Sequence, residues 1–289
     1  MNPGDLSVVV PCHNVGSTLA EQLDALLAQD CGGAFEFEVV LVENRSTDDT
    51  LAVARTYAAR DSRVRVVTAD ARGGASYARN TGIRAAGAQM VVLCDGDDIV
   101  RPGWLAAMAN GLAEHPVVTG PVNADLLNPA WLVRTRGALP MDAPRKLLGR
   151  IPIAPSGNIA MRRDVWEKVG GYDEDIDVGE DQEFCIRLWE QHIPIHFAPG
   201  AEIAYRYRTD ARSLFRQGRF YGRGRPLVYR RAAAAGVRAP RFAGWRSWLL
   251  LVAWLPRLRS VEGRASWCWL AGVRLGQLEG SLRQRSLYL

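Results

Sequence analysis

The first 120 residues alternate short apolar runs with longer segments whose apolar residues recur at helical spacing. A short apolar run bounded by turn residues is typical of a buried strand. Runs of this kind lie at residues 6–11, 37–42, 64–67, 91–94 and 117–120. Strands that alternate with helices predict a mostly parallel sheet with helices on both faces, so we expect an α/β fold.

Each of the first four predicted strands runs into a polar segment at its carboxyl end. These segments are residues 11–14, 43–49, 72–75 and 95–98. The carboxyl ends of parallel strands share one edge of the sheet, and open α/β sheets bind their ligands at that edge. The four polar segments are therefore expected to face one crevice.

The most distinctive of these segments is Asp95-Gly96-Asp97-Asp98. A backbone turn at Gly96 lets the carboxylates of Asp95 and Asp97 converge on one hard cation. Mg²⁺ and Mn²⁺ prefer oxygen ligands, and Mg²⁺ is usually held by one or two carboxylates plus substrate phosphates. A solvated acidic turn explains the same residues, because Asp and Gly are ordinary turn residues. Taken alone, this segment leaves both interpretations open.

The pattern is weaker after residue 120. Residues 123–150 show no clear period, and we expect a long loop there. Ser156-Gly157-Asn158 precedes a short apolar run at 159–161, and Glu180-Asp181 opens an amphipathic helix. An acidic pair at a helix start interacts favourably with the helix dipole, which is the simplest explanation of Glu180 and Asp181 when they are considered alone.

Charge divides the chain near residue 204. Residues 205–289 contain 18 arginines, no lysine and three acidic residues, a formal charge of +15, whereas the whole chain carries +5. We therefore predict an acidic domain over residues 1–204 and an Arg-rich helical region over residues 205–289, with different partners. The tail suits an anionic membrane surface or a phosphorylated substrate. Nucleic acid is not expected, because the first part is acidic and no nucleic-acid motif is present.

One apolar segment of the tail, residues 248–255, has only eight residues between Arg246 and Pro256. A membrane-spanning helix needs about 20, so we do not expect one here. Two interpretations stay open: a helix packed on the core, or a helix lying in the membrane interface with Trp and Arg at the level of the headgroups.

The five cysteines are scattered and form no C-x-x-C pair, so neither a zinc site nor a disulfide framework is expected. Reduced cysteines favour a cytosolic protein. The first residues also lack the basic start of a signal peptide. We therefore expect a cytoplasmic location, either free or on the inner face of the membrane.

Five short motifs follow one another between residue 6 and about residue 200. They are Val8-Val9-Val10-Pro11-Cys12-His13-Asn14, Val42-Glu43-Asn44-Arg45-Ser46-Thr47-Asp48-Asp49-Thr50, Arg79-Asn80-Thr81-Gly82, Asp95-Gly96-Asp97-Asp98 and Gly179-Glu180-Asp181. Each motif alone is weak, but the ordered set resembles the family 2 inverting glycosyltransferases. The resemblance implies a GT-A fold, a Rossmann-like and mostly parallel sheet with helices on both faces, which the helical tail would follow.

The resemblance also implies where the nucleotide-sugar donor would bind. Glu43 would accept a hydrogen bond from the base, Arg79 would be a charge partner, and Asp95 would contact the ribose or the sugar. The residues expected at the donor are Pro11, His13, Asn14, Glu43, Asn44, Arg79, Asp95 and Gly96.

The resemblance assigns the remaining chemistry to a second set of residues. Asp97, together with Asp95, would bind Mn²⁺ or Mg²⁺. Asp181 matches the position of the base that takes the proton of the acceptor hydroxyl. Gly157, Asn158 and Glu180 would lie on the acceptor side.

The implied function is transfer of one sugar, with inversion, from a nucleotide-diphospho-sugar. The donor would be linked to UDP or GDP, and the acceptor would be a glycan, a lipid-linked molecule or a small molecule. The Q-x-x-R-W motif of processive members is absent, so a polymer synthase is not expected. Glu43 stands where Asp is usual, Arg45 replaces a common Gly, and Tyr205 lies where a metal-binding His is often found.

Two alternatives remain beside the transferase. A non-catalytic nucleotide-sugar-binding protein would keep the donor site without needing Asp181. A sugar-phosphate nucleotidyltransferase would need a Gly-rich, basic phosphate loop after the first strand, and Pro11-Cys12-His13-Asn14 is not such a loop.

Overall fold

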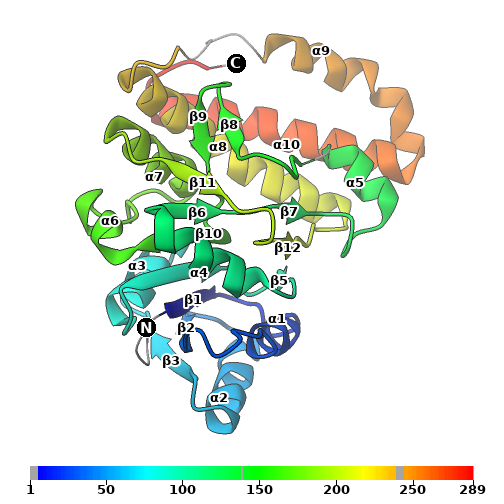
Figure 1. Cartoon of the computed structure of the whole chain (residues 1–289). Helices are drawn as coiled ribbons and strands as arrows, with labels where there is room; N and C mark the ends of the chain where they lie inside the picture. Colours follow the sequence, from blue (N-terminus) through cyan, green and yellow to red (C-terminus); the bar gives the residue numbers. More distant parts are fainter. Residues whose placement is uncertain (1–5, 138, 239–243, 289) are drawn as a thin grey trace.

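A seven-stranded sheet forms the centre of the computed structural model, which describes residues 6–137, 139–238 and 244–288 (Figure 1). Its strands are β1 (Leu6–Cys12), β2 (Phe37–Glu43), β3 (Val64–Thr68), β4 (Met90–Cys94), β6 (Val117–Thr119), β10 (Asn158–Arg162) and β11 (Ile195–Phe197). Their order is β11-β6-β10-β4-β1-β2-β3, and only β10 runs antiparallel to its neighbours. The predicted α/β fold with a mostly parallel sheet is confirmed.

Helices cover both faces of this sheet. They are α1 (Leu19–Leu27), α2 (Thr50–Arg60), α3 (Ala75–Ala85), α4 (Trp104–Glu114), α6 (Arg163–Lys168) and α7 (Glu180–Glu190). Successive side chains of a strand point to opposite faces. Val8 and Val10 therefore join the core beneath α1 and α4, while Val9 joins the core beneath α3 and α7. Burial on both faces explains why β1 is a continuous apolar run.

Smaller elements fill the region where the sequence pattern was weak. β5 (Ile99–Val100), β12 (Ile203–Ala204) and β7 (Val122–Asn123) form a three-stranded sheet, and β8 (Arg145–Leu147) pairs with β9 (Ile151–Ile153). Helix α5 (Ala130–Arg136) also lies here. The expectation of one long loop over residues 123–150 was therefore wrong. Leu132 of α5 is buried against Tyr207, Leu214 and Ala265, so packing against distant residues stabilises this short helix.

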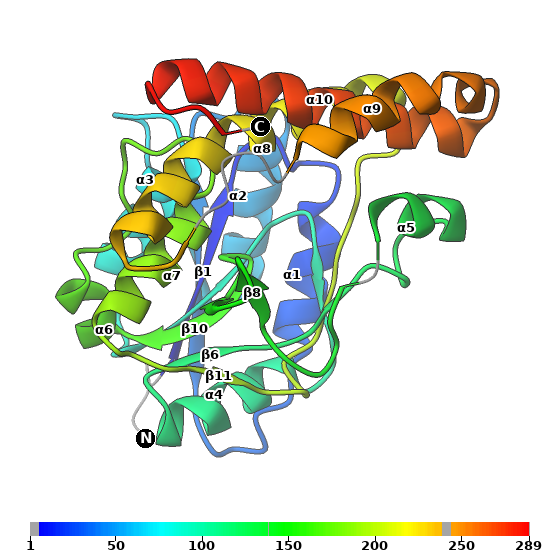
Figure 2. The same ribbon diagram turned by 90° about the horizontal axis from the view of Figure 1, so that it is seen from above.

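The tail forms a helical layer over one edge of the sheet. It consists of α8 (Ala211–Ala234), α9 (Trp245–Ala253), a 3₁₀ turn η1 (Leu255–Arg259) and α10 (Val261–Arg283). In Figure 2, β1 runs from the side of the N-terminus toward α8 and α10. The layer therefore lies on the side of the carboxyl end of β1. None of the helices in the described residues is long and apolar enough to cross a membrane.

Helices α8 and α10 pack backbone against backbone. Gly218 and Gly222 on α8 lie against the backbone of Trp269 and Val273 on α10. In the same way, glycines on α10 lie against the backbone of Phe215, Arg219 and Arg223 on α8; they are Gly272, Gly276 and Gly280. A Cβ built at Gly276 would lie 2.0 Å from the carbonyl oxygen of α8 that it faces. No larger residue fits at such a distance, so the glycines set how closely the two helices approach.

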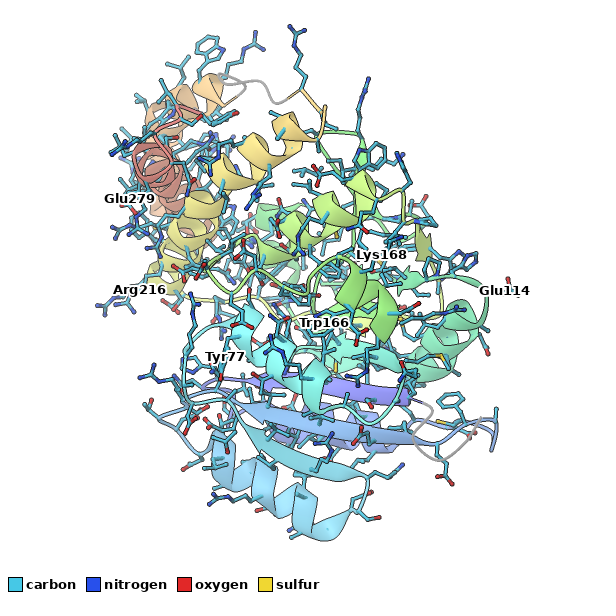
Figure 3. The ribbon with its side chains drawn as sticks, turned by 90° about the vertical axis from the view of Figure 1, so that its left-hand side faces the viewer. Tyr77, Glu114, Trp166, Lys168, Arg216 and Glu279 are labelled. Carbon is cyan, nitrogen blue, oxygen red and sulfur yellow. The ribbon has the colours of Figure 1, made fainter. Side chains whose placement is uncertain are left out.

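The helical layer is also fixed to the α/β part. A Cβ at Gly224 of α8 would lie 2.4 Å from the carbonyl oxygen of Val178, just before α7. Further along α8, Val228 and Ala232 are buried with Ile186 of α7. Figure 3 shows this layer from the side, above α3 and the sheet. The loop that leads into α7 is therefore held between the sheet and α8.

We predict that Gly276→Ala destabilises the protein. The new methyl group would meet the carbonyl oxygen of Arg219 at 2.0 Å and push the helices apart. Overpacking of this kind costs about 1–3 kcal/mol, which should exceed the gain of about 1 kcal/mol in helix propensity. Thermal and urea unfolding measure the change. Leu282→Ala, at an 80% exposed position of the same helix, is the control and should be nearly neutral. A higher melting temperature for Gly276→Ala would contradict the close packing.

Candidate active site

The acidic loop after β4 is held in a defined turn. The side-chain amide of Gln22 donates to the backbone oxygen of Asp95 at 3.0 Å, and the hydroxyl of Thr18 donates to that of Gly96 at 3.3 Å. Both donors belong to the start of α1. Opposite the loop, a Cβ at Gly157 would lie 2.6 Å from Asp95 Oδ2. Gly157 is therefore required for the close approach of the Asp95 carboxylate.

Arg79 of α3 joins two acidic segments that are distant in the sequence. Its Nη2 lies 3.0 Å from Asp95 Oδ1, and its Nη1 lies 2.7 Å from Glu180 Oε1 at the start of α7. The residue is only 5% exposed. Although burial opposes the charge, Asp95 and Glu180 raise the pKa of the Arg79 guanidinium. Arg79 therefore stays charged and brings the central strand and α7 together.

Asp181 follows Glu180 in the first turn of α7. Its Oδ1 accepts a hydrogen bond from the backbone N–H of Gln182 at 2.7 Å. Burial, and then the like charge of Glu180, raise the pKa of the Asp181 carboxyl to about 7. The hydrogen bond and Arg79 oppose this rise without cancelling it. Asp181 is therefore balanced between its acid and its base form near neutral pH, as a proton-transfer group requires.

Two arginines that the sequence analysis did not single out reach the acidic loop from the segment after β12. Arg206 donates its backbone N–H to Asp98 Oδ1 at 3.0 Å, and its side chain donates to the backbone oxygen of Asp97 at 3.1 Å. Arg208 Nη2 lies 3.2 Å from Asp97 Oδ2. The two arginines are two residues apart in an extended segment, so their side chains point to the same side. This pattern could have indicated that they act together, but both were counted only as part of the basic tail.

The acidic loop holds two aspartates whose ionised form is disfavoured by their surroundings. Burial and the neighbouring carboxylates raise the pKa of both Asp97 and Asp98. Asp98 Oδ2 is buried and has no hydrogen-bond partner among the described residues. Such crowding favours a bound cation, and carboxylate oxygens are the ligands that Mg²⁺ and Mn²⁺ prefer. Within residues 6–137, 139–238 and 244–288, three or more metal-ligating side chains do not converge, so a cation held here would need further ligands, such as the phosphates of a substrate.

The loops after β1 and β2 are joined to each other by hydrogen bonds. His13 Nδ1 lies 2.7 Å from the backbone oxygen of Asn44, and Asn14 Oδ1 accepts from the backbone N–H of Thr47 at 2.8 Å. Glu43 is 6% exposed, and its Oε1 accepts from the backbone N–H of Ser46 at 2.6 Å. Oε2 of Glu43 has no such partner in the part of the chain that the structure describes, so it is the oxygen left for a ligand.

The amides of two expected site residues are used within the protein. Asn158 is fully buried, and its amide bonds to Trp104, Pro121 and Ala201, so its side chain fixes the strands behind Gly157. The amide of Asn44 is also used within the protein: it donates to the backbone oxygens of two residues of the 69–72 segment and accepts from Gly74 N–H. Asn44 therefore orders the loop after β3 with its side chain, which leaves no polar atom of that amide free for a ligand.

The other expected residues lie along one edge of the sheet. Pro11 and Gly96 are near one another, since a Cβ at Gly96 would lie 3.7 Å from the backbone oxygen of Pro11.

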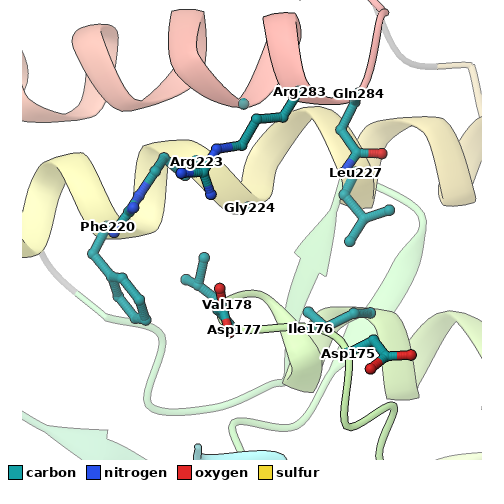
Figure 4. A pocket seen from close by; sticks show the side chains of 11 residues that line it. Asp175, Ile176, Asp177, Val178, Phe220, Arg223, Gly224, Leu227, Arg283 and Gln284 are labelled. Carbon is teal, nitrogen blue, oxygen red and sulfur yellow. The ribbon is translucent and has the colours of Figure 1, made fainter.

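Beside the loop that leads into α7, a cavity of about 130 Å³ opens between Val178 and the layer of α8 and α10. Arg223 and Arg283 line this cavity from the two helices (Figure 4). It borders the segment that leads to Asp181 and does not include the acidic loop.

Sequence comparison places this arrangement in a family. The model of glycosyl transferase family 2 matches residues 7–170, and that of glycosyl transferase family group 2 matches residues 90–275. The chain belongs to glycosyl transferase family 2. The first match includes the loops after β1, β2 and β4, and the second includes α7 with Asp181, so the two together cover the whole candidate site.

Curated glycosyltransferases match this chain over different lengths. A pre-mycofactocin glycosyltransferase of Mycobacterium tuberculosis is 25% identical over 86% of this chain and 52% of its own length. The glycosyltransferase AglE of Haloferax volcanii is 24% identical over 87% of this chain and 82% of its own length. Glycosyltransferase GlyG of Streptococcus pneumoniae is 33% identical over 38% of this chain. The chain spans 26%, 35% and 52% of three curated relatives, about half of their length or less.

Solved structures of GT-A glycosyltransferases share the fold. The mannosyltransferase PcManGT of Pyrobaculum calidifontis, in complex with GDP-Man and Mn²⁺, superposes with a TM-score of 0.64 at 19% identity, covering 98% of this chain and 89% of that protein. S. aureus TarS in complex with UDP-GlcNAc superposes with a TM-score of 0.57 at 18% identity, covering 98% and 93%. The family 2 chain described here therefore has the GT-A fold.

We predict that Arg79→Met strongly destabilises the protein. The change leaves the partly buried carboxylates of Asp95 and Glu180 without their shared partner, and breaking a buried ion pair costs about 3–5 kcal/mol. Chemical denaturation measures this loss. Arg84→Met on the same helix is the control, because Arg84 is largely exposed and pairs with Glu174 at 3.1 Å; an exposed pair contributes at most about 1 kcal/mol. Equal losses for the two variants would show that Arg79 does not join the two acidic segments.

Proposed function

We propose that this glycosyltransferase moves one sugar, with inversion and without processivity, from a nucleotide-diphospho-sugar to an acceptor hydroxyl. The observation that supports this most directly is the convergence of two acidic groups on Arg79. Asp95 lies at the end of the central strand and Glu180-Asp181 at the start of α7. One group suits the donor and its cation, and the other supplies a base for the acceptor.

The donor would bind along the loops at the carboxyl ends of β1, β2 and β4. Glu43 Oε2 would accept a hydrogen bond from the base, and the loop of His13 and Asn14 would frame the nucleotide. Asp95 and Asp97 would hold Mn²⁺ or Mg²⁺. When bound, such a cation supplies positive charge that stabilises the leaving diphosphate. Arg79 keeps the Asp95 carboxylate in place, so it is a positioning residue for this site.

Asp181 would act on the acceptor. A hydroxyl is a poor nucleophile until a carboxylate takes its proton, and general-base catalysis of this kind contributes roughly 10²–10⁴-fold. A pKa of about 7 makes Asp181 a stronger base than an ordinary aspartate while leaving it ionised at slightly alkaline pH. The proton moves from the acceptor oxygen to an Asp181 oxygen as the acceptor oxygen bonds to the anomeric carbon and the nucleoside diphosphate leaves.

The nature of the donor rests on similar proteins and on the base site. PcManGT binds GDP-Man and TarS binds UDP-GlcNAc, and a carboxylate such as Glu43 can accept from an N–H of either base. We therefore propose a UDP- or GDP-linked sugar. The acceptor would be a glycan, a lipid-linked molecule or a small molecule with a free hydroxyl.

The two alternative functions make different use of the site. A nucleotide-sugar-binding protein has no need for a carboxyl whose pKa is raised to about 7 beside Glu180, because a buried, repelled acid weakens the fold without aiding donor binding. A nucleotidyltransferase needs a basic phosphate loop, whereas the loop after β1 holds His13 and Asn14 in hydrogen bonds with the β2 loop.

We expect UDP or GDP to raise the melting temperature, and more strongly with Mn²⁺ present. A ligand at about 100 times its Kd stabilises the native state by about 2.7 kcal/mol. Asp97→Asn should remove the Mn²⁺-dependent part of the shift, because it removes a charged metal ligand. Asp164→Asn, an exposed aspartate on α6 outside the site, is the matched control and should behave like the wild type. A shift that is equal with and without Mn²⁺ would argue against the cation.

We expect Asp181→Asn to lower turnover by roughly 10²–10⁴-fold while the Kd of the nucleotide stays unchanged. Because the Asp181 pKa is raised to about 7, the wild-type rate should fall about tenfold per unit as the pH drops below 7, where the carboxyl is protonated and cannot accept a proton. Steady-state rates between pH 5 and 9 test this. An unchanged rate for Asp181→Asn would show that Asp181 is not the base, whereas nucleotide binding without any transfer by the wild type would support the binding protein.

Glu180→Gln is the matched variant for this pH dependence. It removes the like charge that raises the Asp181 pKa but leaves the base in place. The acidic side of its pH–rate profile should therefore move to lower pH. If this part of the profile does not move, the titrating group is not Asp181.

A further inference from the structure

The most unusual surface of the molecule is formed by α9 and η1, residues 245–259, which we call the α9–η1 surface. None of its residues is buried, although eight consecutive apolar residues lie in it. Trp245, Leu249 and Val252 are 52%, 59% and 67% exposed. They recur at positions i, i+4 and i+7, so they form one apolar stripe along α9.

The opposite side of α9 is already used. Trp248, Leu251 and Trp254 are partly buried, and the indole N–H of Trp267 on α10 donates to the backbone oxygen of Leu251 at 2.8 Å. The helix is thus attached to α10 by one apolar side and presents a second apolar side outward. A contiguous exposed apolar patch usually marks a site of interaction with a protein or a membrane, so the outer side is a candidate docking surface.

The charge around the stripe is of one sign. Residues 245–261 contain Arg246, Arg257 and Arg259 and no acidic residue. The guanidinium of Arg246 lies 5.7 Å from the ring centroid of Trp245, and that of Arg257 lies 5.3 Å from the ring centroid of Trp254. Tryptophan and arginine next to an apolar stripe are typical of a helix that lies in a membrane interface. Its arginines contact the headgroup phosphates, and its apolar side chains contact the acyl chains.

We propose that the α9–η1 surface docks the protein on an anionic membrane surface, with the stripe of Trp245, Leu249 and Val252 in the interface and the arginines on the lipid phosphates. A second copy of the chain is a poorer occupant, because two tails of formal charge +15 would meet. The docking goes beyond the sugar transfer proposed above, and its test needs neither donor nor acceptor.

The position of this surface agrees with peripheral attachment. In Figure 1, α9 lies at the outside of the helical layer, with α10 and α8 between it and the sheet. The carboxyl end of β1 points toward the same layer (Figure 2). A membrane at α9 would therefore lie beside the helical layer and away from α2 and β3 at the opposite end of the molecule.

Flotation of the full chain with vesicles tests the proposal. The wild type should float with vesicles of phosphatidylcholine mixed with the anionic lipid phosphatidylglycerol and should float little with pure phosphatidylcholine. Salt should release it, because surface charges are screened. Removing three basic charges from a membrane-bound surface should weaken partitioning by more than roughly tenfold. We therefore expect a loss of at least that size for the triple variant Arg246→Gln, Arg257→Gln and Arg259→Gln.

Matched variants distinguish binding through the α9–η1 surface from binding through the overall positive charge of the chain. Arg55→Gln, Arg60→Gln and Arg101→Gln remove three exposed arginines from elsewhere and should leave flotation unchanged. Trp245→Ser, Leu249→Ser and Val252→Ser should abolish it, whereas Leu126→Ser, Met141→Ser and Trp189→Ser, at exposed apolar positions elsewhere, should not. Equal flotation of the two apolar variants would overturn the proposal.

Hydrogen exchange of the wild-type chain gives a second measurement that does not depend on any variant folding. Addition of the anionic vesicles should slow amide exchange in residues 245–259 and leave α2 unchanged. Protection elsewhere without protection of the α9–η1 surface would overturn the proposal. So would a stable dimer, seen by analytical ultracentrifugation without lipid, that Trp245→Ser, Leu249→Ser and Val252→Ser dissociates.

Discussion

The arrangement of the site depends on the buried guanidinium group of Arg79. Arg79 is almost inaccessible to solvent and pairs with two acids that lie far apart in the sequence, Asp95 and Glu180. In a poorly hydrated site each carboxylate would repel the others, and the guanidinium is what makes their proximity tolerable. Its fixed fork also orients both groups. Without it, α7 would bring Asp181 to a loop that repels it.

The helical layer adds a mechanical constraint to this electrostatic one. The glycines of α8 and α10 let two long helices touch through their backbones, and Gly224 lets α8 touch Val178 before α7. Close backbone contact at these small residues thus fixes the position of the layer relative to the start of α7. The acidic pair is therefore held from two sides, by Arg79 in the sheet half and by α8 in the helical half.

Local pattern predicted the sheet well because the strands are buried on both faces and therefore read as unbroken apolar runs. The strand pattern placed the loops of Glu43 and Asp95 at one edge, and β2 and β4 do run parallel to β1. Arg206 and Arg208 were missed because they contact a loop that lies more than 100 residues earlier in the chain. Only the position of β12 in the fold brings them there. Helix α5 and the glycine contacts were missed for the same reason: each depends on partners from distant parts of the chain.

The pairing of Arg208 with Asp97 means that the loop is never without a counter-ion. Arg208 is more than half exposed at its side chain and lies 3.2 Å from the carboxylate, so it can leave without unpacking the core. A divalent ion bound at Asp97, as proposed above, would therefore replace one positive charge with another rather than add one. Such an exchange would spare the protein an uncompensated acid cluster, and the ion would bind less tightly than it would to an empty site.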